Sequence, residues 1–181
     1  RPDGRLDLTR MSALVDQIAE LRRMDKEVIL ISSGAVAAGK GEMKECTGLD
    51  AVSARQLFSA VGQIKLMNRY DEFFGGYGLR CGQVLTMKES FSTRRHYLNQ
   101  KQCMEVMLEH GIVPVVNEND TVSVTELMFT DNDELSGLVA TMMGVDVLLI
   151  LSNVDGVYDG DPALPTSALL REVVPDGRRG T

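Results

Sequence analysis

Helical and strand-like patterns of hydrophobic residues alternate along the first half of the chain. Apolar side chains between Leu8 and Leu21 recur at spacings of three and four residues, which predicts an amphipathic helix. The run Val28–Ile31 is apolar at every position, which is typical of a strand buried on both faces. A second long helical pattern covers Ala54–Phe74 and ends at the glycines that follow it.

The same alternation continues through the second half. We expect strands at Leu79–Met87, Ile112–Val116 and Asp146–Leu151, and helices at Tyr97–His110 and Asn132–Met143. Helices that alternate with strands predict an α/β fold, in which helices cover both faces of a mainly parallel sheet. Because no internal repeat, low-complexity tract or linker interrupts the pattern, we predict one domain.

The composition excludes several classes of function. A net charge of −7 and a pI of about 4.9 argue against a nucleic-acid partner. The longest apolar stretch, Val145–Leu151, is interrupted by Asp146 and is far too short to cross a bilayer, and residues 1–10 do not resemble a signal peptide. The three cysteines form no C-x-x-C pair, and the two histidines have no metal-ligand spacing with them. We therefore expect a cytoplasmic protein with reduced cysteines, no protein-bound metal and no membrane partner.

Polar clusters stand beside two of the predicted elements. The segment Asn117–Asp120 follows a strand, and Asp131–Asp133 stands at the start of a helix; a short hairpin fits between them. Such positions are where α/β proteins hold small polar ligands, here one with an ammonium group and negatively charged oxygens. Asp120 is the expected acceptor for the ammonium. Ordinary turn formation and N-capping are the alternatives for the two clusters.

Two further turn segments also follow predicted strands. Ser32–Ala35 offers hydroxyls and free backbone N–H groups at the start of a helix, which suits a carboxylate or phosphate, although a serine N-cap also explains it. Ser152–Tyr158 follows the last predicted strand, at the same sheet edge if all strands are parallel. The chain has neither a G-x-x-x-x-G-K-[ST] motif nor a G-x-G-x-x-G after a strand, which excludes a P-loop kinase and the usual dinucleotide site.

These segments, taken together, resemble the amino acid kinase family, and specifically its members that phosphorylate glutamate. The resemblance covers nearly the whole chain in the same order, and the pairing of Asn-Glu-Asn-Asp with Asp-Asn-Asp is specific within the family. The matching segments are Ser32–Gly39, Ala60–Gln63, Tyr97–Asn99, Ile112–Val122, Asp131–Ser136, Asp155–Tyr158 and Asp161–Pro162.

The resemblance implies a three-layer αβα sandwich that transfers the γ-phosphoryl group of ATP to the side-chain carboxylate of L-glutamate. The product is L-glutamyl 5-phosphate, the first intermediate on the route to proline. The resemblance further implies Mg²⁺ as a cofactor, feedback inhibition by proline and a homo-oligomer. Because a carboxylate is already nucleophilic, such a reaction needs alignment and charge neutralisation more than a strong base.

Site residues follow from the matching motifs. Ser33, Asp120 and Asn132 are expected to hold glutamate, with Asn117 shaping that pocket. Asp133 is the expected catalytic residue, an acid that orients the lysines around the transferred phosphoryl group. Along ATP the resemblance places Ser152, Asn153 and Thr181, although the family more often has an aspartate in place of Asn153.

The lysines that the family uses have no counterpart in the chain. One belongs to a Gly-rich loop after the family's first strand, and the other to a Thr-Gly-Gly-Met-x-Thr-Lys stretch, whose first residue the resemblance assigns to Thr181. Residues 1–181 are therefore expected to be a kinase domain without its first strand and C-terminal part. Lys40, Lys65 and Lys88 lie outside the matching positions and are not assigned a role.

Two alternatives stay open from the sequence. One is a non-catalytic amino-acid-binding or regulatory module of the same fold, which keeps the glutamate pocket without the lysines. The other is a kinase of the same fold that acts on a different acidic metabolite.

Overall fold

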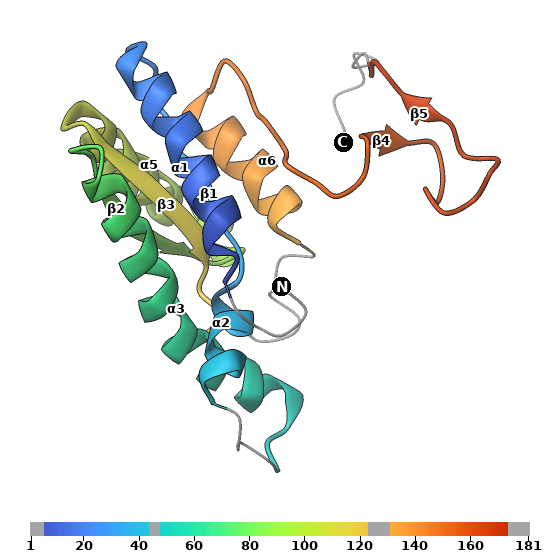
Figure 1. The fold of residues 1–181 in the computed structure, drawn as a ribbon, viewed down its shortest axis with the longest axis horizontal. Helices are drawn as coiled ribbons and strands as arrows, with labels where there is room; N and C mark the ends of the chain where they lie inside the picture. The colour runs from blue at the N-terminus through green and yellow to red at the C-terminus, as the bar shows by residue number, and fades with distance from the viewer. Residues whose placement is uncertain (1–5, 44–47, 123–130, 174–181) are drawn as a thin grey trace. The chain divides into compact units, whose positions relative to one another are not determined.

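The computed structural model of the chain describes residues 6–43, 48–122 and 131–173. The chain divides into two compact units, Arg1–Leu148 and Leu149–Thr181. The first unit contains the sheet and all the helices of the described chain (Figure 1). In order these elements are α1 (Leu8–Arg23), β1 (Leu30–Ile31), α2 (Ala35–Glu42), α3 (Ala51–Gly75), β2 (Arg80–Thr86), α4 (Glu89–Ser92), α5 (Arg94–Glu109), β3 (Ile112–Glu118) and α6 (Asn132–Met143).

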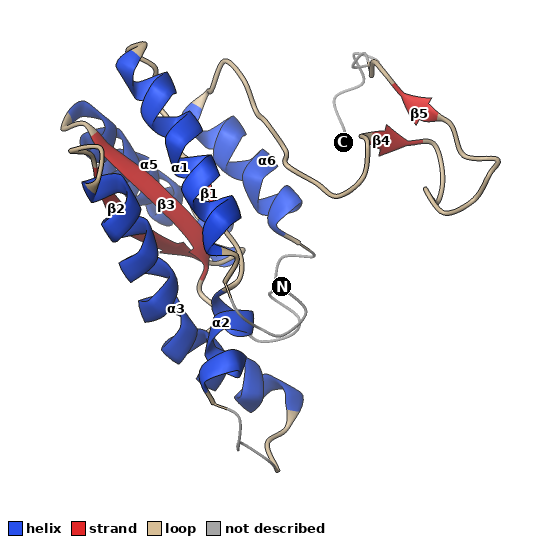
Figure 2. Cartoon of the chain, in the orientation of Figure 1, coloured by secondary structure: helices blue, strands red, loops and turns tan. Residues whose placement is uncertain are grey.

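The sheet is parallel, with the strand order β1-β3-β2, and helices cover both of its faces (Figure 2). Val113 and Val115 of β3 pack against α1 and α3, whereas Val116 packs with Met104 of α5 and Val139 of α6. Side chains of β3 alternate between the two faces, so one strand supplies both hydrophobic cores. This arrangement confirms the predicted α/β fold and the three-layer sandwich.

Strand β1 is shorter than the predicted strand Val28–Ile31, because only Leu30 and Ile31 pair with β3. The backbone N–H of Ser32 donates to the carbonyl oxygen of Val116 at 2.9 Å, so the edge of β3 that carries Val116 faces β1. Pro114, two residues earlier, presents the same edge and has no N–H to donate. The missing donor explains why the ladder does not extend back to Val28.

The predicted strand Asp146–Leu151 is wrong. This segment has no regular structure, and its apolar side chains are exposed; Leu149 and Leu151 are 73% and 78% exposed. An apolar, β-branched run forms a strand only where another strand pairs with it. Within the described residues, no strand pairs with this segment.

The second unit contains one small antiparallel sheet. β4 (Val157–Tyr158) pairs with β5 (Leu169–Leu170), two strands that the sequence patterns did not predict. Asp159 closes the connection, because its Oδ1 accepts from the backbone N–H of Ala168 at 2.7 Å. None of the helices in the described part of the chain combines the length and hydropathy that a membrane-spanning helix requires.

Candidate functional site

A cavity of about 500 Å³ lies in the first unit, between the start of α2, the first turns of α3, the end of β3 and the start of α6. Ser33, Asn117, Asp120 and Asn132 all line it. These residues lie up to 99 positions apart in the sequence (132 − 33), and the parallel sheet brings them together at the carboxyl ends of β1 and β3. That edge is where open α/β sheets bind ligands.

The two serines after β1 have different surroundings. Ser32 is buried; its Oγ lies 2.9 Å from the hydroxyl of Tyr70, and its N–H bonds to Val116. Ser33 is exposed and lines the cavity. Ser32 therefore anchors the turn, whereas Ser33 remains available on the cavity wall.

The N-terminus of α2 forms part of the cavity wall. Gly34 is the N-cap in a left-handed conformation, with φ 101°, which favours glycine. The first bond of the helix runs from the N–H of Ala38 to the carbonyl of Gly34, and the preceding residues 35–37 line the cavity. Because the first N–H groups of a helix have no partner within it, this turn suits negatively charged oxygens.

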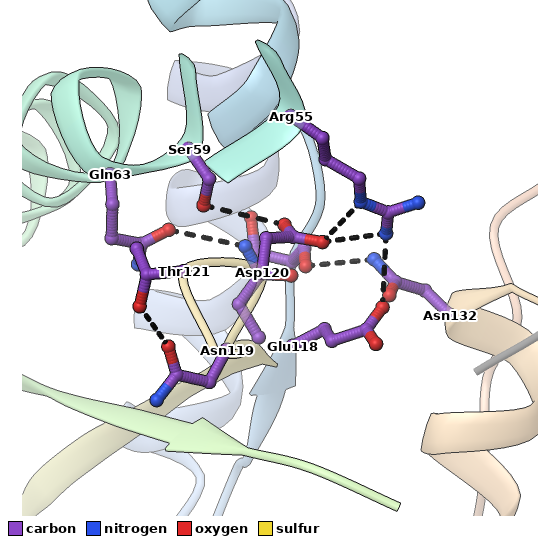
Figure 3. A network of polar contacts seen from close by, with 10 residues as sticks. Arg55, Ser59, Gln63, Glu118, Asn119, Asp120, Thr121 and Asn132 are labelled. Carbon is purple, nitrogen blue, oxygen red and sulfur yellow. Dashed lines mark hydrogen bonds and ion pairs between the residues drawn. The ribbon is translucent and has the colours of Figure 1, made fainter. Parts of the chain in front are cut away.

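Arg55 of α3 bridges two buried carboxylates at the end of β3 (Figure 3). Its Nε donates to Oδ1 of Asp120 at 2.7 Å, and its Nη2 lies 2.6 Å from the same oxygen and 3.2 Å from Oε2 of Glu118. Glu118 and Asp120 are 5% and 6% exposed. The guanidinium therefore supplies the charge compensation that two carboxylates need once they leave water.

Arg55 belongs to a polar stripe on α3 that the sequence prediction missed. Ser59 donates to Oδ2 of Asp120 at 3.4 Å, and the Oε1 of Gln63 accepts from Nδ2 of Asn117 at 3.2 Å. Residues 55, 59 and 63 are four apart, so they lie on one face of the helix (Figure 3). Polar residues at that spacing within a long, mostly apolar helical pattern were the available signal.

At the start of α6, one residue caps the helix and the next one lines the cavity. Asp131 is the N-cap, and its Oδ1 accepts from the N–H groups of Asp133 and Glu134 at 3.0 and 2.9 Å. Asn132 donates from Nδ2 to the carbonyl oxygen of Ser32 at 2.9 Å, which ties α6 to the turn after β1. Capping therefore explains Asp131, and Asn132 serves the cavity.

Asp133 does not line the cavity, although it neighbours Asn132. Its side chain is exposed in the first turn of α6. Lys40, which the sequence analysis left without a role, lines the cavity as its second cation beside Arg55. Lys65 and Lys88 form ion pairs with Glu42 and Glu134 instead.

The residues predicted to lie along ATP fall outside the first unit. Ser152 and Asn153 are exposed residues of the second unit, where the Oγ of Ser152 accepts from the N–H of Val154 at 3.4 Å. Thr181 lies outside the described residues. The described residues contain no group of three or more His, Cys, Asp or Glu side chains placed to hold a metal ion.

Comparison with known proteins gives a consistent result. A sequence model of the amino acid kinase family matches residues 3–176. A protein named glutamate 5-kinase from Bacteroides thetaiotaomicron is 66% identical over 173 residues, which cover 96% of this chain and 48% of that protein. Proteins of the same name from Chlorobaculum tepidum and Streptomyces coelicolor are 49% and 45% identical, over 90% and 94% of this chain and 46% of each protein. The chain thus spans about half the length of the curated relatives that it matches.

Proposed function

Because the chain belongs to the amino acid kinase family, we propose that it forms the substrate-binding part of an ATP-dependent glutamate 5-kinase. The reaction transfers the γ-phosphoryl group of ATP to the side-chain carboxylate of L-glutamate and gives L-glutamyl 5-phosphate, the first step of proline biosynthesis. The names of the curated relatives and their identity over most of this chain support this assignment.

The observation that carries the proposal is that Ser33, Asp120 and Asn132 line the same cavity. The chemistry of the cavity suits an acidic amino acid. Its buried carboxylates can bind an ammonium group, and the N-terminus of α2 and two cations can bind carboxylate oxygens. In this proposal Asp120 accepts from the ammonium. Ser33, Asn132 and the first turn of α2 hold the carboxylate that becomes phosphorylated.

Asp133 is proposed as the catalytic residue beside this pocket, where its carboxylate orients the cations around the transferred phosphoryl group. It is exposed one residue after Asn132, which lines the cavity, so its carboxylate is accessible to cations from the solvent. ATP supplies the phosphoryl group, and Mg²⁺ neutralises charge on its phosphates. Mg²⁺ commonly takes one or two protein carboxylates together with phosphates and water, so an exposed aspartate suits it. Ser152 and Asn153 are proposed to lie along ATP.

The remaining parts of the proposal concern partners and location. Proline carries an ammonium and an α-carboxylate on the same carbon, as glutamate does, so it can compete for Asp120 and inhibit by feedback. We also propose a cytoplasmic homo-oligomer.

The test measures acyl phosphate formation by the complete gene product that contains this chain. Hydroxylamine converts an acyl phosphate to a hydroxamate, which is detected together with ADP release. We expect both products with L-glutamate and much less with L-aspartate or N-acetylglutamate. A preference for another acid would establish the second alternative, and glutamate binding without ADP release would establish the non-catalytic module.

A further inference from the structure

Building on the proposed function, we infer that Arg55 is a specificity-determining residue that binds the α-carboxylate of the amino acid substrate. In the structure Arg55 contacts Asp120, the residue proposed for the ammonium. The substrate's ammonium takes over Asp120, and the guanidinium passes to the substrate's α-carboxylate. Arg55 and Asp120 thus form a matched pair for one zwitterion.

The contact between Arg55 and Asp120 does not use all the hydrogen-bond donors of the guanidinium. Both Nε and Nη2 of Arg55 approach the same oxygen, Oδ1 of Asp120, whereas a carboxylate that binds arginine well gives each nitrogen its own oxygen. The Nη1 atom makes no hydrogen bond or ion pair to the described residues, and in Figure 3 it points away from both carboxylates. A second carboxylate can therefore gain contacts that Asp120 does not use.

Substrate chemistry places the α-carboxylate at this residue. The ammonium and the α-carboxylate are bonded to the same carbon, so an ammonium on Asp120 brings the α-carboxylate next to the group that Asp120 already contacts. The carbon of the side-chain carboxylate is about three bonds from the α-carbon, so this carboxylate remains free to reach Ser33 and α2. The two ends of glutamate are thereby distinguished.

The exchange leaves no buried carboxylate without a cation. Asp120 gains the ammonium as it loses Arg55, and Arg55 keeps its ion pair with Glu118 at 3.2 Å. An isolated buried charge is costly, which is why the pair must open and re-form in one step with binding. Glu118 therefore acts as the pivot that retains Arg55 in the cavity.

The experiment compares two ligands on the complete gene product by calorimetry without ATP. L-Glutamate is one, and 4-aminobutanoate, which is glutamate without its α-carboxylate, is the other. For the unmodified protein we expect glutamate to bind at least about 100-fold more tightly. Arg55→Gln is expected to weaken the binding of glutamate by about 100-fold. Its binding of 4-aminobutanoate is expected to be no weaker, since Glu118 and Asp120 still receive the ammonium.

Two further variants keep the result interpretable. Arg55→Lys retains the charge between the buried carboxylates, so it folds even if Arg55→Gln does not. Because lysine lacks the planar guanidinium, the affinity of this variant for glutamate is expected to fall by about 10-fold, and its affinity for 4-aminobutanoate is expected to stay the same. Arg69→Gln is the matched control, because Arg69 lies on the same helix in an exposed pair with Glu72 and outside the cavity. It is expected to change neither affinity.

The outcomes separate the two proposals. Suppose that the unmodified protein binds glutamate, and that the Arg55 variants lower the affinity for both ligands equally or change neither affinity. The proposed role of Arg55 is then wrong, and the glutamate assignment stands. If the unmodified protein binds no glutamate, the proposed function fails and the role of Arg55 fails with it.

Discussion

The backbone nitrogen of Gly39 in α2 lies 2.4 Å from the point where a β-carbon on Gly62 of α3 would stand. The same point is 1.8 Å from the carbonyl oxygen of Ala35, and a β-carbon on Gly39 would be 1.8 Å from the carbonyl oxygen of Phe58. The two helices therefore touch through their backbones. Since α2 supplies one wall of the cavity and α3 carries Arg55, this crossing sets the separation of the two walls.

Gly62→Ala is therefore expected to force α2 away from α3 and to destabilise the protein by at least about 3 kcal/mol. Urea unfolding measures the loss. Gly137→Ala is the matched control, because Gly137 lies inside α6 with no atom within 4 Å of its β-carbon position. That change is expected to stabilise by about 0.5–1 kcal/mol. Equal stability of the two variants would contradict the close crossing.

Asp120→Asn tests the ammonium site with little change in shape. The amide cannot compensate an ammonium charge, so we expect the KM for glutamate to rise by about 100-fold. The KM for ATP is expected to change by less than about 2-fold, because the lost interaction concerns glutamate only. Steady-state kinetics with each substrate varied in turn gives both values. Unchanged saturation by glutamate would remove Asp120 from the substrate site.

Asp131 and Asp133 are two positions apart but are expected to respond oppositely to replacement by alanine. Asp131 caps α6 through the N–H groups of Asp133 and Glu134, so Asp131→Ala is expected to cost about 1 kcal/mol of stability. The exposed carboxylate of Asp133 contributes little to stability, so Asp133→Ala is expected to unfold at nearly the same temperature.

The activity of these two variants supplies the second readout. Asp133→Ala is expected to lower kcat by about 100-fold or more with a smaller effect on the KM for glutamate, as for a group needed mainly in the transition state. Asp131→Ala is expected to retain most of the kcat once it is folded. A purely raised KM in Asp133→Ala would argue against its catalytic role.

The elements that the sequence predicted well are those whose signals are local. Asp131 at the N-cap and Gly144, left-handed at the C-cap, bound α6, and the structure has the predicted limits Asn132–Met143. The segment Asp146–Leu151 has an equally clear apolar pattern, yet it forms no strand. Strand formation requires a partner elsewhere in the chain, and the pattern carries no information about one.

The same distinction applies to the cavity. Ser33, Asp120 and Asn132 stand in motifs that can be recognised along the sequence, and the structure brings them to one place. Arg55 meets Glu118 and Asp120 from 63 and 65 positions away, so only the folded chain shows that its charge belongs to them. A long-range ion pair therefore escapes an analysis of local spacing.

The two described cysteines are expected to differ sharply in their reaction with iodoacetamide. Burial, and to a smaller extent the nearby charge of Asp71, raises the pKa of Cys81 in β2 to about 11. The thiolate is the reactive form, so at pH 8 only about one Cys81 in a thousand is poised to react. Cys103 on α5 is exposed. We expect it to be alkylated first.

Mass spectrometry of a Cys46→Ser background measures the two sites separately, since Cys46 lies outside the described residues. Because the raised pKa keeps the Cys81 thiol protonated, its alkylation rate is expected to climb as the pH rises toward about 11. In concentrated urea the burial is lost, so the difference between Cys81 and Cys103 is expected to disappear. Alkylation of Cys81 at pH 8 as fast as that of Cys103 in the folded protein would contradict the packing of β2 against α3.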